Sequence, residues 1–556
     1  MPKSQRSNYK LISAMLKLAD CTKIEFILVV IGIIASAIFV FIRPQIICRL
    51  TDQGLENKDL QLVMIWCVGL LIISLLDNAN ELMQIKIFTC MSNKFTRRLY
   101  LEALSSILSA PYELSKTRTA TEMVSTISTD VEKTSLLIDR NMLTAITGVF
   151  QVIGGIAGVF ILKWEIAIII ICVIPIKQAL IIRLSKQRAV FARDLLSKFQ
   201  VFSEWFGEQI NGVFEIKLWN LYSGRIKVFI KKYRDIMDIN KKLEMCDGIE
   251  NSVRCIIDQI IEVVIYIYCG FLVCSNNMSL GGLLAVIAYS TNITAPMDYI
   301  ANIPYIWSKI RPSVERLYEL FAWPTEDKQS TCVKNDSYDL TLDKVSFGFD
   351  KDHRILEDVS INIPYGSKIA IIGENGSGKT TLVNIILGII RADAGTISLG
   401  EQDIYDLGLK KWRDCFAVVN QNSYLFKGTI EENVFLKESL DLSKLENHVI
   451  HNEVRGLCGD KINFYSQILL ENGKDLSCGE RQKIAILRAL CKDSKIVIMD
   501  ESLSNLDSES RARMHEALLS PDYHKTVIII SHYEEDITGV QQIYRLREGH
   551  VETISI

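Results

Sequence analysis

The sequence lacks a strongly basic charge balance and any metal-type cysteine cluster. It has 62 lysines and arginines against 65 aspartates and glutamates, which gives a net charge of −3. A general nucleic-acid binder needs surplus positive charge to neutralise phosphates, so no nucleic-acid partner is expected. The 14 cysteines are scattered singly, without a Cys-x-x-Cys pair or histidines at metal-ligand spacing. This pattern argues against a zinc site.

The first apolar segment also lacks the features of a cleavable signal peptide. The run from Phe26 to Ile42 has no charged residue, and no small-residue cleavage site precedes Arg43-Pro44. A run of about 20 apolar residues is long enough to cross a bilayer as a helix. Six such segments are interpreted as transmembrane spans: 24–45, 61–85, 143–162, 165–185, 254–274 and 280–300.

The links between the spans predict the topology. The links after spans one, three and five are short, whereas those after spans two and four are long and rich in lysine and arginine. Positively charged loops stay on the cytoplasmic side, so both termini and the long loops are expected in the cytoplasm. The long loops keep helical periodicity, which predicts that spans two to five continue as helices beyond the lipid bilayer. We expect a multi-pass protein of the cell membrane, in a bacterium the cytoplasmic membrane.

A polar stretch divides the chain into two expected domains. Residues 1–322 form the transmembrane domain, residues 323–338 a linker, and residues 339–556 a domain of short Val/Ile-rich strands alternating with helices. That alternation is typical of a parallel α/β sheet. The predicted fold class is a polytopic α-helical membrane domain with long intracellular extensions, followed by an α/β domain.

A phosphate-binding loop follows the predicted strand Lys368–Ile372. The segment Gly373–Thr380 reads G-x-x-x-x-G-K-[ST], and a helix is expected from Thr381. Glycines allow backbone N–H groups to turn inward around phosphates, and the helix N-terminus adds its dipole. Lys379 supplies a positive charge, and Thr380 supplies a hydroxyl for Mg²⁺.

Two further strands of the predicted sheet end in residues suited to phosphoryl transfer. The strand at 495–499 leads into Asp500-Glu501, and the strand Thr526–Ile530 leads into Ser531-His532. Asp500 is expected to hold Mg²⁺, and Glu501 to polarise the attacking water. A histidine at a strand end is usually structural, but at the ligand-binding edge of such a sheet we interpret His532 as a γ-phosphate sensor.

The segment Leu476–Lys483, which reads LSCGERQK, identifies the kind of nucleotide-binding protein. Together with Gly373–Thr380, Gln421, Asp500-Glu501, Ser504–Asp507 and His532, its order and spacing resemble an ATP-binding-cassette (ABC) ATPase. The six spans, Leu280–Leu283 at the start of span six, and Leu425–Ile430 after the glutamine resemble a half-transporter of the exporter type. The resemblance covers nearly the whole chain, and it implies that the α/β domain is a P-loop ABC ATPase domain.

The resemblance implies a dimer in which each ATP lies between one phosphate loop and the partner's signature segment. Phe349 occupies the position of an aromatic that stacks on adenine, and segments 111–121 and 205–217 look like coupling helices. The expected ATP-binding residues are Phe349, Gly373, Asn375, Gly376, Ser377, Gly378, Lys379, Thr380, Thr381, Ser477, Gly479, Glu480 and Asp507. The expected metal ligands are Thr380, Gln421 and Asp500, and the expected catalytic residues are Glu501, His532 and Gln421.

Two residues depart from the usual Leu-Ser-Gly-Gly-Gln signature of the family. Cys478 replaces the first glycine, and Glu480 replaces the glutamine. The glutamate is a mild change, whereas a Cβ at position 478 matters if the backbone there needs φ > 0 or close approach to phosphate. We favour a homodimer with a harmless variant signature. The alternative is a heterodimer in which this signature completes a poorly hydrolysing site.

Acidic residues in the spans give the only indication of the cargo. Asp77, Glu81, Asp258, Glu262 and Asp298 are expected roughly 18–30 Å from the outer face. They could form an acidic vestibule for cationic cargo, but the preferred interpretation is that they pair with Lys86, Arg254 or Lys309.

The leading functional hypothesis is ATP-driven export by alternating access, with a cationic peptide as cargo. A multidrug exporter and a flippase for lipids or lipid-linked glycans share the same architecture and remain open. An ATP-gated membrane regulator that does not pump is the alternative from another class. No cysteine-protease motif precedes span one, so cleavage of leader peptides is not expected.

Overall fold

The computed structural model divides into two compact units, which are described separately. It describes residues 8–19, 22–116, 120–326, 337–350, 353–374, 376–436, 466–503, 506–531 and 537–554. The first unit comprises residues up to Ser105 together with Ala120–Ala322, and the second comprises Ser106–Thr119 and Trp323–Ile556. The expected linker at 323–338 falls within the second unit and is described only at its ends.

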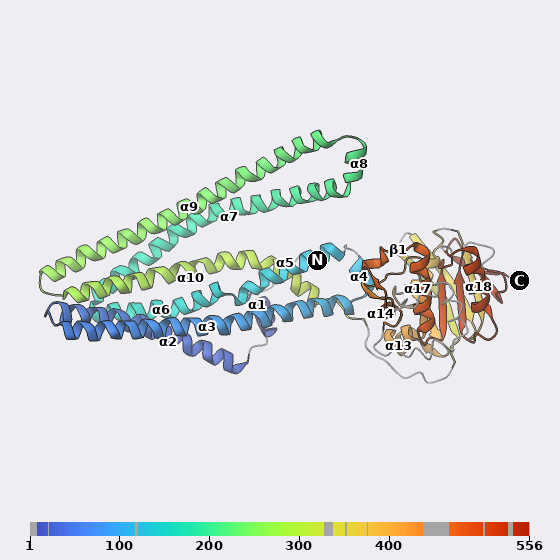
Figure 1. Cartoon of the computed structure of the whole chain (residues 1–556), viewed down its shortest axis with the longest axis horizontal. Coiled ribbons are helices and arrows are strands. Elements are labelled where there is room, and N and C mark those ends of the chain that lie inside the picture. The colour runs from blue at the N-terminus through green and yellow to red at the C-terminus, as the bar shows by residue number, and fades with distance from the viewer. Residues whose placement is uncertain are drawn as a thin grey trace. The chain divides into compact units, whose positions relative to one another are not determined.

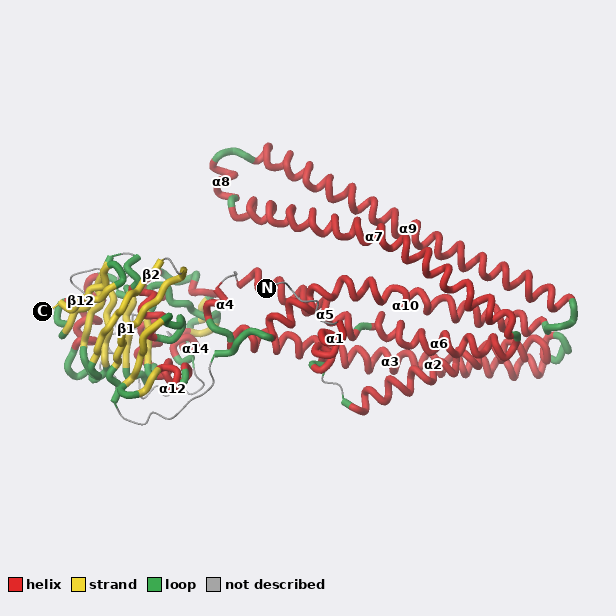
Figure 2. Tube along the Cα trace, turned by 180° about the vertical axis from the view of Figure 1, so that it is seen from behind, coloured by secondary structure: helices red, strands yellow, loops and turns green. Residues whose placement is uncertain are grey.

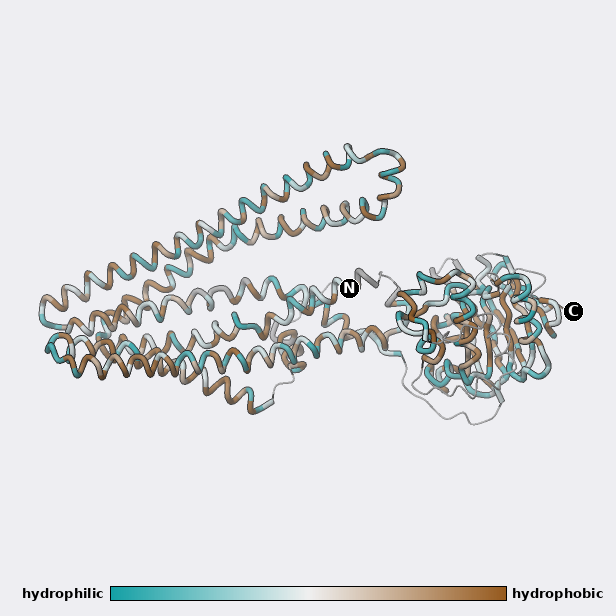
Figure 3. Tube along the Cα trace, viewed as in Figure 1, coloured by the Kyte–Doolittle hydropathy of each residue, from teal (hydrophilic) through white to brown (hydrophobic). Residues whose placement is uncertain are grey.

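The first unit is entirely helical, and Figure 1 shows its helices running alongside one another. Its elements are α1 (Asn8–Lys17), α2 (Lys23–Arg49), the π-helix η1 (Leu50–Leu55), α3 (Leu60–Ser109), α5 (Ala120–Ser135), the 3-10 turn η2 (Leu136–Ile138), α6 (Arg140–Leu162), α7 (Trp164–Asn211), α8 (Val213–Leu218), α9 (Tyr222–Cys274) and α10 (Leu280–Phe321). Within the described residues, six helices are long and apolar enough to cross a membrane. The predicted six long apolar helices are therefore confirmed, and Figure 3 shows the apolar residues concentrated along them.

Three of these helices are far longer than a membrane span. Helices α3, α7 and α9 have 50, 48 and 53 residues. At ~1.5 Å per residue each is more than 70 Å long, whereas the hydrocarbon core is about 30 Å thick. Helices α7 and α9 lie side by side and are joined by α8 at their tip (Figure 1). The predicted continuation of these spans beyond the membrane is confirmed for α3, α7 and α9.

Polar contacts and small residues hold the apolar helices together. Asn80 of α3 donates to Gly32 O at 3.0 Å and to Ser36 Oγ at 2.9 Å, and Gln84 donates to the same hydroxyl at 3.1 Å. On α6, a Cβ added at Gly155 would lie 2.7 Å from the Ile293 side chain of α10. Lipid offers helices no hydrophobic advantage for association, so close packing and interhelical hydrogen bonds of this kind define the bundle.

The second unit is built on two main sheets. A mostly parallel sheet has the strand order β12-β11-β3-β10-β9-β6, an antiparallel sheet has the order β2-β1-β4-β5, and β7 pairs with β8. The strands are β1 (Leu340–Asp350), β2 (His353–Ile363), β3 (Lys368–Gly373), β4 (Ala394–Leu399), β5 (Gln402–Asp403), β6 (Phe416–Val419), β7 (Gly428–Thr429), β8 (Ile468–Leu469), β9 (Ile496–Asp500), β10 (Thr526–Ile530), β11 (Gln542–Arg547) and β12 (His550–Ile554). Figure 2 shows these strands with helices packed around them. The α/β fold class is confirmed.

Two apolar cores flank the parallel sheet. One lies between the two sheets and includes buried residues of β1, β2, β3 and α11. The other lies on the opposite face and joins β9 and β10 to α14, α17 and α18. The helices of this unit are α4 (Tyr112–Lys116), α11 (Lys379–Ile386), α12 (Ile404–Leu407), α13 (Leu409–Asp414), α14 (Ile430–Val434), the 3-10 turn η3 (Glu471–Gly473), α17 (Cys478–Cys491) and α18 (Ser508–Leu519). Strands β3, β9 and β10 coincide within one residue with the three strands predicted from the sequence.

Candidate ATP-binding site

The carboxyl ends of three neighbouring parallel strands bring the predicted phosphate-handling residues together. Strand β10 lies between β3 and β9, and Ile530 is in register with both Ile371 and Asp500. The loop after β3 and the acidic pair after β9 therefore leave the sheet at the same edge. In open α/β sheets, ligands bind at this edge.

The loop after β3 has the backbone of a phosphate cradle. Gly376 and Gly378 have φ of 84° and 103°, which non-glycine residues rarely adopt. A Cβ at Gly378 would also lie 2.9 Å from the Ile355 side chain. The Ser377 Oγ is buried and has no hydrogen-bond partner among the described residues. An unused hydroxyl in a glycine cradle at a helix N-terminus fits the phosphates of ATP.

Lys379 begins α11 and points its ammonium back into the loop. Its Nζ donates to Gly373 O at 2.8 Å and to Glu374 O at 2.9 Å, and the residue is 5% exposed. Burial lowers the pKa of Lys379, while the nearby carboxylates of Glu501 and Asp500 act to raise it. A buried ammonium close to two carboxylates is positioned to offset the charge of a bound phosphate.

The acidic pair and the predicted glutamine meet at the same edge. Asp500 ends β9 and is buried, and the Gln421 Nε2 donates to Glu501 Oε2 at 3.1 Å. Glu501 has a φ of 47°, and its backbone N–H donates to Ile530 O at 2.9 Å. Thr380 adds a hydroxyl on the first turn of α11. The possible metal ligands among these residues are hard oxygen atoms, including a single buried carboxylate. This set suits Mg²⁺ bound together with substrate phosphates.

Some predicted site residues lie outside what the structure describes. Asn375 and His532 fall among the residues that are not described, and so do Ser504 and Asn505. The backbone of Phe349 belongs to β1, but its side chain is not described. Their roles stay predictions.

The signature segment forms the N-terminus of α17. Ser477 is the N-cap, and its Oγ accepts from Glu480 N at 3.2 Å and donates to Glu480 Oε2 at 2.8 Å. The Ser477 N–H donates to the same carboxylate at 2.9 Å, which completes a capping box. Cys478 starts the helix in right-handed backbone geometry. The N-terminus of α17 therefore does not need a glycine at position 478 for a positive φ.

The comparisons with known proteins decide the family. Residues 26–297 match the family described as "ABC transporter transmembrane region", and residues 356–504 match the family described as "ABC transporter". The chain is an ABC exporter half-transporter. Such a half-transporter works as a dimer, and its second unit is an ABC transporter ATPase.

Individual relatives of this half-transporter differ in what they are named for. It is 25% identical to a "Multidrug resistance ABC transporter ATP-binding and permease protein" of Lactococcus lactis subsp. cremoris, over 97% of this chain and 92% of that protein. It is also 25% identical to the "Lactococcin-A transport/processing ATP-binding protein LcnC" of Lactococcus lactis subsp. lactis, over 86% of this chain and 67% of that protein. An "ATP-dependent lipid A-core flippase" of Cupriavidus pinatubonensis is 22% identical over 95% and 90%.

A solved structure confirms the fold of the half-transporter. The structure of a bacterial Atm1-family ABC exporter with ATP bound superposes with a TM-score of 0.80, covering 96% of this chain and 95% of that one, at 19% sequence identity. The relatives together support ATP-driven export by a multi-pass membrane protein with bacterial homologues, while their names divide among drug, peptide and lipid.

Asp507 lies just beyond the acidic pair and caps α18. Its side chain accepts from Ser510 N at 3.0 Å, and Lys483 of the signature helix lies 4.0 Å away. The hydrogen bond from the Ser510 backbone is the main reason why the pKa of Asp507 is lowered. Its predicted contact with ATP stays a prediction.

Two residues that sequence reasoning missed tie the signature helix to the segment after Gln421. Arg488 of α17 donates to Asn433 O at 2.7 Å and to Tyr424 O at 2.9 Å. The buried Asn433 amide makes two hydrogen bonds to the Phe426 backbone, both at 2.8 Å. Its Oδ1 accepts from the Phe426 N–H, and its Nδ2 donates to Phe426 O. Burial lowers the pKa of Arg488. The signal was present, because Arg488 is the only charged residue in the run Ile484–Leu490.

Two acidic residues of the spans lie beside cations that were not among the expected partners. Asp258 of α9 accepts from the Lys177 Nζ of α7 at 2.6 Å, and Glu81 lies 3.6 Å from Arg140. The expected partner Arg254 instead pairs with Glu250 at 3.1 Å. Lys177 and Arg140, which lie beside Asp258 and Glu81, are cations that the sequence analysis did not name as partners. The side chain of Asp298 is not described.

Proposed function

We propose that two copies of this chain form a homodimer with two equivalent ATP sites and export cargo across the cytoplasmic membrane. Each site would join the phosphate loop of one copy to the signature helix of the other. The observation that carries the homodimer is the capped N-terminus of α17, which keeps its helical geometry with cysteine at position 478. A helix N-terminus attracts phosphate through its dipole and its free N–H groups, so this signature stays competent to close an ATP site.

The chain's own residues support hydrolysis at each site. Bound Mg²⁺ would be held by Asp500, Thr380 and Gln421, and would neutralise phosphate charge. Lys379 balances the phosphate charge from within the loop, and Glu501 orients the attacking water. The Gln421 hydrogen bond to Glu501 holds that carboxylate toward the site.

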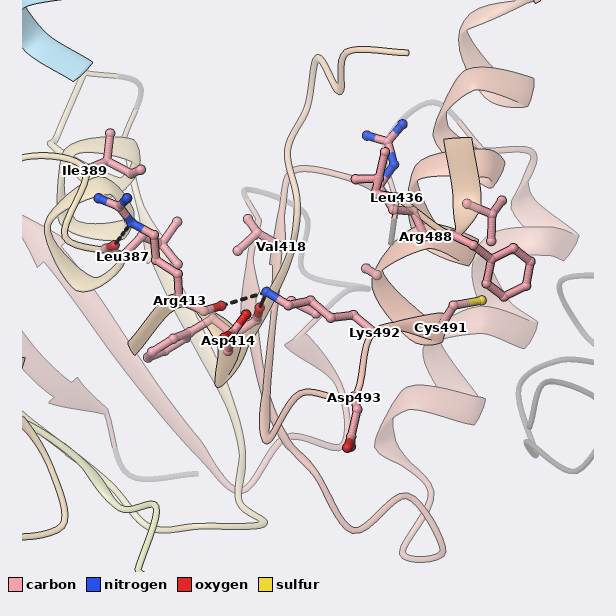
Figure 4. Close-up of a pocket in the computed structure, with 15 residues that line it drawn as sticks. Leu387, Ile389, Arg413, Asp414, Val418, Leu436, Arg488, Cys491, Lys492 and Asp493 are labelled. Carbon is pink, nitrogen blue, oxygen red and sulfur yellow. Dashed lines mark hydrogen bonds between the residues drawn. The ribbon is translucent and has the colours of Figure 1, made fainter. Parts of the chain in front are cut away.

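A groove on the ATPase unit supports coupling to the membrane helices. It has a volume of about 600 Å³ and lies beside the C-terminal end of α17, with Leu387, Phe416 and Leu436 among its lining residues (Figure 4). The tip of the α7–α9 hairpin carries exposed aromatic side chains, with Phe214 at 71% and Trp219 at 68% exposure. Large exposed apolar groups mark interaction surfaces. We infer that α8 of one copy docks in this groove of the other, and that α4, in the second unit of its own chain, acts as the first coupling helix.

For the cargo we propose a cationic peptide, recognised in part by Glu262. Asp258 and Glu262 lie one turn apart on α9 and share a face. Lys177 neutralises Asp258, whereas Glu262 has no hydrogen bond or ion pair within the part of the chain that the structure describes. An acidic group within a span is costly unless it meets water or a partner, which favours a functional role for Glu262.

The homodimer is tested by expressing the chain with two different tags. Both tags should be recovered in one complex of two chains, and that complex should hydrolyse ATP at two sites per dimer. Recovery of an active complex only with an unrelated second half-transporter would exclude the homodimer.

The cargo is tested by replacing Glu262 with glutamine in reconstituted dimers. Stimulation of ATPase activity by a cationic peptide should fall, while basal activity is retained. Glu244→Gln on the cytoplasmic part of α9, where Glu244 accepts from Asn240, is the matched control. Equal stimulation of all three proteins, or stimulation only by lipids or neutral drugs, would overturn the cationic-peptide assignment.

A further inference from the structure

A small polar pocket lies at the N-terminus of the signature helix. It has a volume of about 170 Å³ and is lined by segment 420–423, Asn472 and the start of α17. From α17 it is lined by Cys478, Arg481 and Gln482. The volume is several times the ~30 Å³ that one water molecule occupies, so the pocket has room for a group of amino-acid side-chain size.

Cys478 lines this pocket from the first turn of α17. Cys478 is exposed, and the Arg481 guanidinium donates to its Sγ at 3.1 Å. Arg481 also lines the pocket, and its guanidinium, next to the sulfur, can pair with a carboxylate placed there. A thiol that lies beside a fixed guanidinium is set up to react with a small molecule that carries a carboxylate.

Gln482 is an independent sign that the pocket takes a ligand. It is 4% exposed, and neither its amide nitrogen nor its amide oxygen has a hydrogen-bond partner within the described residues. A buried amide without partners costs free energy that a matching ligand recovers. The ligand should therefore supply an acceptor and a donor close to the carboxylate that Arg481 binds, as an amino acid does.

We propose that Cys478 is a redox modification site that reacts with a low-molecular-weight disulfide of the cystine class. The Cys478 thiolate attacks one sulfur of the disulfide, forming a new S–S bond to a cysteinyl group. The original S–S bond breaks, and the departing cysteine thiolate takes up the proton that Cys478 released. Arg481 pairs with the carboxylate of the attached group, and the Gln482 amide meets its polar atoms.

The attached group controls ATP turnover because it lies at the N-terminus of α17. This consequence rests on the proposed dimer, in which Ser477 and the N-terminus of α17 face the partner's ATP. A cysteinyl group on the adjacent Cys478 occupies that approach. We expect ATP turnover to fall by about 10²-fold, the scale on which losing one donor to transition-state charge acts.

Cys491 provides a matched control on the same helix. It ends α17, is only partly exposed, and burial raises its pKa to about 12. A thiol of that kind is a poor nucleophile at neutral pH. Cys491 should therefore remain unmodified under conditions in which Cys478 reacts.

The experiment uses the full chain in lipid nanodiscs, treated with cystine or with cystamine. Cystamine carries the same disulfide without carboxylates. Peptide mass mapping should show one cysteinyl group on Cys478, formed faster from cystine than from cystamine, and dithiothreitol should restore ATPase activity. Cys478→Ser should make treated and untreated rates equal, Cys491→Ser should keep the wild-type ratio, and Arg481→Met should remove the preference for cystine.

Each outcome bears on the proposal. Absence of the adduct on Cys478, or equal rates with both disulfides, would overturn the modification site, whereas an adduct that leaves ATP turnover unchanged would overturn its control of turnover. The Glu501→Gln variant loaded with ATP distinguishes the proposed dimer from the pocket itself. If Cys478 reacts equally with and without trapped ATP while the cystine preference remains, the shared-site dimer fails and the modification site stands.

Discussion

The backbone at Glu501 predicts an unusual response to mutation. Its φ of 47° is left-handed, a conformation that costs a non-glycine residue roughly 1–2 kcal/mol. Strain of this kind is kept where function requires it. The Glu501 N–H bond to Ile530 O and the side-chain bond to Gln421 hold the residue in place. Among variants that lose the catalytic carboxylate, one that also relieves the backbone strain should therefore be more stable than one that keeps it.

The comparison of Glu501→Gly with Glu501→Ala isolates this strain. Both variants lose the carboxylate and its bond to Gln421, but only glycine adopts φ of 47° without a Cβ penalty. Glycine lowers the free energy of unfolding by roughly 0.5–1 kcal/mol relative to alanine, because the unfolded chain with glycine is more flexible. The glycine variant should be about 1 kcal/mol more stable than the alanine variant. For a unit of about 250 residues this corresponds to a midpoint higher by about 2–4 °C.

The assay is calorimetry of the full chain in detergent without nucleotide. Glu509, an exposed residue in the right-handed first turn of α18, provides the control pair. Glu509→Gly should be less stable than Glu509→Ala, the reverse of the order at position 501. Both Glu501 variants should lack ATP hydrolysis. If Glu501→Ala is as stable as Glu501→Gly, the strain argument is refuted.

Three further perturbations follow from the ion pairs and caps. Asp130→Asn removes the charge that pairs with Arg316 between α5 and α10 and should cost about 1–3 kcal/mol, seen as a lower unfolding midpoint of the first unit. Asp258→Asn removes the carboxylate that lies 2.6 Å from the buried Lys177 ammonium and should cost about 1–3 kcal/mol, and a double-mutant cycle with Lys177→Met should show that the two positions are coupled. The pKa of Asp507 is lower in the folded protein than its unfolded value of about 4, so the charged cap stabilises the fold at pH values above the unfolded pKa. That stabilisation is lost as the pH falls through the folded pKa. Asp507→Asn should therefore flatten the acid side of the plot of stability against pH.

Local patterns made the ATP site predictable. A strand, a glycine loop and a helix follow one another in Lys368–Ile386, and the acidic pair directly follows a buried strand. Parallel strands share one carboxyl edge, so the meeting of Lys379, Asp500 and Glu501 follows from short segments of sequence. Gln421 was placed by the family resemblance, and its bond to Glu501 agrees with that placement.

Long-range geometry was not predictable in the same way. Lys177 and Asp258 are 81 residues apart, and counting depth along each span does not show which helix faces give contact. The hydrogen bond between Arg488 and Asn433 depends on the packing of α17 against the segment after Gln421. The left-handed Glu501 and the right-handed Cys478 are backbone states that residue type alone does not determine.

The most direct test of the shared ATP site is complementation between two inactive variants. Lys379→Met disables the phosphate loop, and Ser477→Arg blocks the signature. In a mixed dimer of the two, the shared-site arrangement places both defects in one ATP site and leaves the other intact. Each variant alone should be inactive, and the mixed dimer should regain up to half of the wild-type ATPase rate. A mixed dimer as inactive as its parents would contradict the shared-site arrangement.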